Sequence, residues 1–136
     1  PVGTDAKGRP YGLVRIGEAA EQPLAEFAAF VKRALSCPGV RFSDAGKPVR
    51  KVAVGGGSCG SEIGDVIAAG CDTFVTADLK YNHFEEAKYR GLNLIDAGHF
   101  ETENPICDVL EGILREAFPE IPVFRARTHR DETQFL

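Results

Sequence analysis

The residues of this sequence best suited to chemistry are His99 and Glu103, which follow an apolar run at residues 92–95. The run predicts a buried strand, and the residues after it predict the first turn of a helix. Residues four apart lie on one face of a helix, so this imidazole and carboxylate can share one divalent ion at about 2.0–2.2 Å each. The alternative is an ordinary helix start, in which Glu103 favours the positive end of the helix dipole and His99 is a half-buried packing residue. Because a metal ion needs three or four protein ligands, this pair would supply about half of the ligands of a metal site.

Two further polar segments follow predicted strands. Asp78 and Lys80 come after the predicted strand at residues 73–76, and a Gly-Gly-Gly-Ser loop at residues 55–58 connects a strand to a helix. Asp78, interpreted as an acceptor beside a ligand or as a base, and Lys80, interpreted as a contact for phosphate or carboxylate, are the candidate catalytic residues. The alternative for both is a solvated residue at a helix start.

The loop amides suit an anion at a helix N-terminus, so Gly56, Gly57 and Ser58 are candidate phosphate-binding residues. The alternative is a tight turn that needs glycine conformations. The carboxyl ends of parallel strands line the ligand crevice of an open α/β sheet. We therefore expect all these segments along one edge of the molecule.

The elements that must position these residues alternate between strands and helices, which predicts a layered α/β/α fold with a largely parallel or mixed sheet. Strands are predicted at residues 12–18, 40–42, 50–54, 73–76, 92–95 and 122–127, and helices at residues 23–35, 61–69, 82–89 and 103–118. The strands at 40–42 and 50–54 are expected to be neighbours. The last helix is expected to bury a stripe made of Ile106, Val109, Leu110, Ile113, Leu114 and Ala117.

Length and composition suit a single domain over residues 1–136, with 43% hydrophobic and 26% charged residues. A net charge of −4 offers no general attraction to nucleic acid or anionic membranes, and no apolar run approaches the roughly 20 residues of a membrane span. The four cysteines form no Cys-x-x-Cys pair, so zinc-ribbon and thioredoxin sites are excluded by spacing. We expect reduced, structural cysteines and a cytoplasmic protein.

Four segments in order, residues 11–18, 52–58, 76–81 and 91–103, resemble the C-terminal half of the Nif-three-like proteins, also called GTP cyclohydrolase 1 type 2 homologues or dinuclear metal-centre proteins. The sequence contains no Met and begins with Pro1, so we expect a piece of a longer two-half protein. Members of the family often carry a histidine directly after the Lys-Tyr pair. Here Asn82 takes that place and His83 follows, which puts a role for His83 in doubt because one position turns a helical side chain by about 100°.

The resemblance implies a pair of divalent ions, zinc, iron or manganese, held by ligands from both halves, with His99 and Glu103 as the ligands from this half. It also implies homo-oligomers, a missing N-terminal half as partner, and a nucleotide or other small-molecule substrate. Opening of the GTP imidazole ring, the reaction in the family's name, suits hydrolysis by paired metal ions. The alternative is a non-enzymatic metal-binding scaffold or regulatory interaction module.

Overall fold

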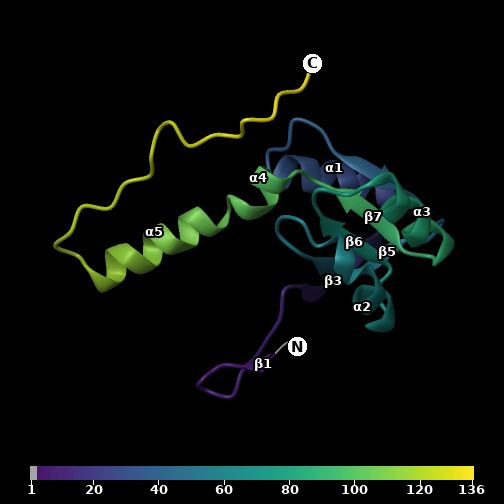
Figure 1. Cartoon of the computed structure of the whole chain (residues 1–136), viewed down its shortest axis with the longest axis horizontal. Helices are drawn as coiled ribbons and strands as arrows, with labels where there is room; N and C mark the ends of the chain where they lie inside the picture. Colours follow the sequence, from purple (N-terminus) through teal and green to yellow (C-terminus); the bar gives the residue numbers. More distant parts are fainter. Residues whose placement is uncertain (1–2) are drawn as a thin grey trace.

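The structure, a computed structural model, describes residues 3–136. Its elements in chain order are β1 (Gly3–Thr4), β2 (Pro10–Tyr11), β3 (Arg15–Gln22), α1 (Leu24–Ala34), β4 (Arg41–Ser43), β5 (Val49–Val54), η1 (Gly60–Glu62), α2 (Ile63–Ala68), β6 (Thr73–Thr76), α3 (Tyr81–Tyr89), β7 (Asn93–Asp96), α4 (His99–Glu103) and α5 (Ile106–Ala117). Figure 1 shows a layered body of strands and helices from which α5 extends to one side.

A five-stranded mixed sheet with the order β3-β5-β6-β7-β4 forms the centre of the body. Strands β5, β6 and β7 are parallel, and the edge strands β3 and β4 pair antiparallel with β5 and β7. Every residue of β6 and β7 is buried, as expected for parallel strands covered on both faces. The predicted fold class, α/β with a largely parallel or mixed sheet, is confirmed.

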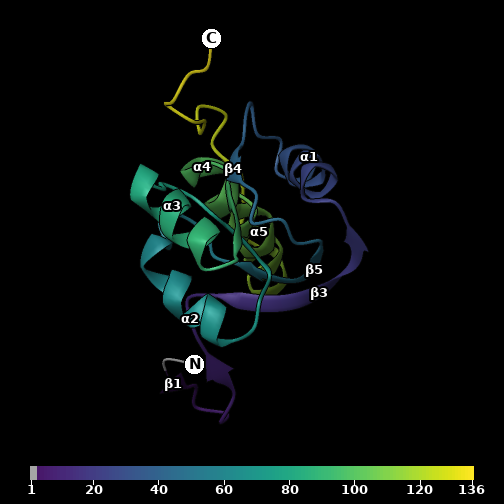
Figure 2. The ribbon, with the colours of Figure 1, turned by 90° about the vertical axis from the view of Figure 1, so that its right-hand side faces the viewer.

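Helices cover both faces of the sheet, as Figure 2 shows with α1 on one side and α2 and α3 on the other. The α1 side buries Leu24, Phe27 and Val31 against Val52 and Ile95 of the sheet. The opposite side packs residues of α2 and α3 against the other sheet face, and its buried members are Ala53, Cys59, Ile63, Val66, Cys71, Phe74, Leu79, Ala87, Leu92 and Leu94. The alternation of side chains along β5, β6 and β7 supplies both cores.

The predicted pairing of the strands near residues 40 and 50 is wrong. Strand β4 pairs with β7, with Phe42 opposite Ile95, and therefore lies at the far edge of the sheet from β3, with two strands between it and β5. The physical reason is burial. Strands β6 and β7 need both faces covered and take the central positions, whereas Arg41 and Phe42 of β4 are exposed and tolerate an edge.

The predicted helix at residues 103–118 is two helices. Helix α4 ends at Glu103 and α5 begins at Ile106, with Pro105 between them. Because proline has no backbone N–H to donate, one helix cannot continue unbroken through this point. The predicted burial of the α5 stripe is also wrong: none of the twelve residues that the structure describes in α5 is buried.

The predicted strand at residues 122–127 is absent from the described part of the chain, where this segment carries no regular element. Figure 1 shows it running back along α5 toward α4. It is fastened by Arg125, whose guanidinium binds the side chains of Asp108 and Asn104, at 2.6 Å each. Side-chain contacts with α5 thus replace the sheet pairing that the sequence pattern suggested.

All four cysteines are free thiols, and Cys37, Cys59 and Cys71 are buried. Burial raises the pKa of the Cys37 and Cys71 thiols, which keeps them protonated and unreactive. Over residues 3–136, no helix is both long enough and apolar enough to cross a bilayer.

Candidate functional site

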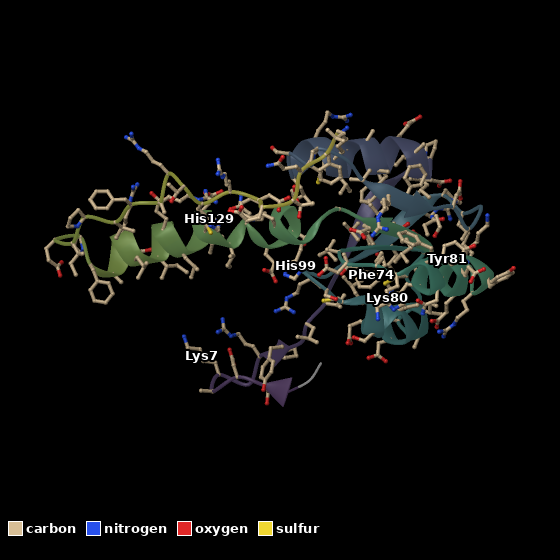
Figure 3. All side chains as sticks on the ribbon, turned by 45° about the horizontal axis from the view of Figure 1, so that its top comes forward. Lys7, Phe74, Lys80, Tyr81, His99 and His129 are labelled. Atoms are coloured by element: carbon tan, nitrogen blue, oxygen red, sulfur yellow. The ribbon has the colours of Figure 1, made fainter. Side chains whose placement is uncertain are left out.

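The candidate site lies where β5, β6 and β7 end. The loop at residues 55–58 follows β5, Asp78 follows β6, and His99 opens α4 directly after β7 and a two-residue turn. Parallel strands bring these three loops to one edge, as the sequence predicted. Figure 3 shows His99 at this edge, between the body of the molecule and α5.

His99 contacts a carboxylate with each of its two ring nitrogens. Its Nδ1 lies 2.6 Å from Oδ2 of Asp78, and its Nε2 lies 3.3 Å from Oε2 of Glu103. All three side chains are about half exposed. The contact of His99 with Glu103 follows from their spacing on α4. The contact of His99 with Asp78 joins residues 21 positions apart and forms only because the fold brings their loops together.

Asp78 has an uncommon backbone conformation, with a φ of 54°. Few residues other than glycine adopt this left-handed region, and aspartate and asparagine are the main exceptions. The turn follows the buried end of β6, and its carboxylate meets His99. The role of Asp78 as an acceptor beside a ligand or as a base stays a prediction; the structure shows its carboxylate in contact with His99.

The hydrogen bond that His99 donates to the Asp78 carboxylate raises the pKa of His99 above its ordinary value, and the Glu103 carboxylate raises that pKa further, while partial burial opposes both effects. Protonated His99 therefore stabilises the fold at pH values below its unfolded pKa, near 6.5. That contribution is lost as the pH rises through the higher folded-state pKa.

We expect Asp78→Asn to lower the pKa of His99 toward 6.5 in the metal-free protein, because the carboxylate that favours the imidazolium is removed. Asparagine tolerates the left-handed conformation, so the fold is retained. Histidine ring resonances followed by NMR against pH measure the change, and His83 serves as the internal control. An unchanged His99 titration contradicts the assigned hydrogen bond.

Gly57 provides the space in which His99 and Glu103 meet. Its φ is 64°, and a Cβ added there would stand 2.5 Å from Oε1 of Glu103 and 3.1 Å from Nε2 of His99. The Gly57 N–H donates to Oγ1 of Thr102 at 2.9 Å, and its carbonyl accepts from the Thr76 hydroxyl at 2.9 Å. The loop is thus fixed against β6 and α4, and the Gly57 amide already has a partner.

Asp96, at the end of β7, connects the loops that carry Asp78 and His99. Its side chain is 7% exposed and accepts from the backbone N–H groups of Leu79 at 3.1 Å and Gly98 at 3.2 Å. It also pairs with the guanidinium of Arg41. Sequence reasoning missed this role because an aspartate after an apolar run signals only a strand end, and all but the Gly98 contact are long-range.

We expect Asp96→Ala to lower the free energy of unfolding by roughly 1.5–3 kcal/mol, the usual range for hydrogen bonds to a charged group. The His99 pKa should also move toward 6.5, since the two loops lose their common acceptor. Urea denaturation and the NMR titration measure the two effects. Glu85→Ala, on an exposed face of α3, is the control and should stay within about 0.5 kcal/mol of the parent.

The remaining predicted residues lie around this edge. Lys80 is exposed at the start of α3, apart from His99 in Figure 3, and its backbone N–H donates to Nδ1 of His83 at 3.2 Å. His83 is thereby a half-buried capping residue of α3. Gly56 and Ser58 are exposed beside Gly57, and their role as phosphate-binding residues stays a prediction.

His99 and Glu103 fit a divalent ion as two of its ligands. They converge over a glycine that leaves room for both, and the Asp78 contact at Nδ1 leaves Nε2 as the ligand atom, an arrangement common at metal-binding histidines. Within residues 3–136, no group of three His, Cys, Asp or Glu side chains is arranged to hold a metal ion. A complete centre therefore needs at least one ligand more than this chain places there.

The chain is similar in sequence to two bacterial proteins that share one name. The chain is 40% identical over 95 residues to a GTP cyclohydrolase 1 type 2 homolog of Nostoc sp., a match that covers 68% of this chain and 36% of the relative. It is 43% identical over 91 residues to the Bacillus subtilis protein of the same name, covering 65% of this chain and 24% of that one.

A solved structure shares the fold. The Staphylococcus aureus protein SA1388 matches 93% of this chain with a TM-score of 0.85 and 31% identity, and the match covers 43% of that protein. The chain thus spans less than half the length of each of these relatives. The sequence profile described as Duf34/NIF3 (NGG1p interacting factor 3) matches residues 4–132, and the chain therefore belongs to the Duf34/NIF3 family.

Proposed function

We propose that this chain contributes His99 and Glu103 to a centre of two divalent ions, zinc, iron or manganese, in a metal-dependent hydrolase. The observation that carries the proposal is the convergence of the two side chains, 3.3 Å apart at Nε2 and Oε2, with Asp78 on the other ring nitrogen. Imidazole nitrogen and carboxylate oxygen suit all three metals. The other ligands would come from the N-terminal half that the family resemblance implies.

The chain's own residues would orient and support that centre. Asp78 holds the ring of His99 and sets the tautomer whose Nε2 is free for a ligand. Thr102 fixes the Gly57 loop under the Glu103 carboxylate. A divalent ion bound there supplies Lewis acidity and activates water for hydrolysis near neutral pH.

A nucleotide is the substrate class we propose, because the Nostoc and Bacillus relatives are named GTP cyclohydrolase 1 type 2 homologs. The candidate phosphate contacts are the exposed residues Lys80, Gly56 and Ser58, since the Gly57 N–H already donates to Thr102. We further propose a cytoplasmic homo-oligomer, in keeping with four free thiols.

A non-enzymatic metal-binding scaffold is the second candidate function. It is favoured by the exposure of the site, since His99, Asp78 and Glu103 have side chains 48%, 52% and 56% exposed. Active sites are usually enclosed and shielded from bulk water, and this chain by itself does not enclose the three side chains.

Turnover of a nucleotide panel that includes GTP, by the natural polypeptide that contains this chain and with each metal added in turn, tests the proposal. Hydrolysis that is lost in His99→Ala and retained in His83→Ala supports the hydrolase. Metal bound in stoichiometric amounts without turnover of any nucleotide favours the scaffold. Absence of bound metal overturns both.

A further inference from the structure

A cavity of about 380 Å³ opens beside His99. Its walls come from residues 39–41, which lead into β4, from residues 98–101 around the start of α4, and from residues 131–135 of the C-terminal segment. Glu103, the other candidate metal ligand, lines a neighbouring cavity instead. Small-molecule sites occupy roughly 300–1,000 Å³, so this cavity is large enough for part of a substrate next to the candidate metal centre.

Glu101 places a buried carboxylate in this cavity. The residue is only 8% exposed and lines the cavity, and no hydrogen bond or ion pair of residues 3–136 reaches its carboxylate. No side-chain oxygen of these residues is both fully enclosed and unpartnered, so the Glu101 oxygens open onto the cavity. Because a charge is costly to bury unless it is paired and hydrogen-bonded, this carboxylate needs donors from outside the described residues.

The position of Glu101 in α4 does not explain its burial. An acidic residue suits the first turn of a helix, but it has the same effect on a helix surface in water. The carboxylate instead lies over Gly98, where an added Cβ would collide with it. Gly98 thus leaves the space in which the buried carboxylate faces the cavity.

The charges around the cavity favour a ligand that brings hydrogen-bond donors. The guanidinium of Arg41, in one wall, is already paired with Asp96. Glu101 and Asp131 then give the walls an excess of negative charge. Since an ionised carboxylate only accepts hydrogen bonds, the cavity would repel a phosphate group and attract N–H donors.

Two aromatic rings suit the cavity to a planar ligand. Phe100 of α4 and Phe135 of the C-terminal segment both line it, and the Phe135 ring packs on Gly39, 3.5 Å from where a Cβ would stand. Proteins that read single bases stack them on aromatic side chains and bind their Watson–Crick edges by hydrogen bonds. The cavity combines both elements, because Glu101 supplies the acceptors.

We propose that this cavity is the base subsite of the nucleotide site and that Glu101 determines its specificity, by accepting hydrogen bonds from N1–H and the exocyclic N2–H of guanine. The inference rests on the proposed nucleotide substrate and adds which base edge is read and by which residue. Adenine presents one N–H donor beside an acceptor nitrogen, and the carboxylate would repel that acceptor.

Equilibrium binding of nucleosides to the natural polypeptide that contains this chain tests the proposal. Nucleosides have no phosphate, and a chelator keeps the protein free of metal, so calorimetric titration measures the base subsite separately from the metal centre. We expect guanosine to bind about 10- to 100-fold more tightly than inosine, which lacks the N2 amine, because one hydrogen bond to a charged acceptor is lost. Adenosine should bind more weakly than inosine.

Glu101→Gln is the informative variant, and Glu85→Gln, on an exposed face of α3, is its matched control. A glutamine amide offers one donor and one acceptor, which complements adenine. Glu101→Gln should therefore weaken guanosine binding by about 10- to 100-fold and strengthen adenosine binding. Glu85→Gln should bind all three nucleosides as the parent does.

Three results overturn the proposal. Equal affinities for the three nucleosides, or no binding of any, show that the cavity reads no base. An unchanged guanosine affinity in Glu101→Gln shows that the carboxylate is not the acceptor. A lower melting temperature of Glu101→Gln without nucleoside binding in the parent shows that a cationic side chain of the same polypeptide fills the cavity.

Failure of the proposed hydrolase gives a different result. Guanosine binding that depends on Glu101, without turnover of any nucleotide, keeps the base subsite and removes the hydrolase. Turnover of GTP and ATP at equal rates, with equal affinities for guanosine and adenosine, keeps the hydrolase and removes the base subsite.

Discussion

Replacing His99 by alanine is expected to abolish tight binding of divalent metal by the natural polypeptide that contains this chain. Loss of a residue that merely supports a metal ligand typically lowers affinity by about 10- to 100-fold, and loss of the ligand itself should lower it further. Glu103→Ala should have a comparable effect because its carboxylate stands beside Nε2 of His99. Calorimetric titration with Zn²⁺ and elemental analysis of the purified variants measure both effects.

His83→Ala is the matched control, because His83 contacts the backbone of Lys80 and lies outside the candidate centre. It should keep the parent's metal content. Asp78→Asn should fall between the two, with the roughly 10- to 100-fold loss of a supporting partner. If His99→Ala and Glu103→Ala both keep the metal content of the parent protein, His99 and Glu103 are not metal ligands. Glu103, which precedes α5, then acts only on the positive N-terminal end of that helix's dipole, and its removal costs roughly 0.3–1 kcal/mol of stability.

Phe74→Ala is expected to destabilise the 136-residue chain by about 3–5 kcal/mol, the cost of emptying a core position of an aromatic ring. Phe74 is fully buried in the central strand β6, where it packs in the core beneath α2 and α3. Urea denaturation measures the loss as a lower midpoint with an unchanged slope.

Leu110→Ala is the informative comparison for Phe74→Ala. The sequence places Leu110 on a core stripe, whereas the structure leaves it 49% exposed on α5. We therefore expect a loss below about 1 kcal/mol in the same chain, because little apolar area returns to water. A loss as large as that of Phe74→Ala would show that α5 packs on the body and contradict its extended position.

The sequence by itself determined the local features of this protein. The run at residues 92–95 predicted β7 as a buried strand, residues 73–76 predicted the strand β6, and the alternation of strands and helices predicted the mixed α/β sheet. Helical spacing placed His99 and Glu103 on one face of α4, where their side chains meet. These features depend on neighbours within a few positions, so residue type and period suffice to predict them.

Only the tertiary structure decided the features that join distant segments. The edge position of β4 follows from competition among strands for the buried centre of the sheet, which no single segment reveals. The contact of Asp78 with His99 and the bridging role of Asp96 join loops that are far apart in sequence. The α5 stripe has the period of a core helix, yet period states only which residues share a face. Whether that face is covered depends on what packs against it.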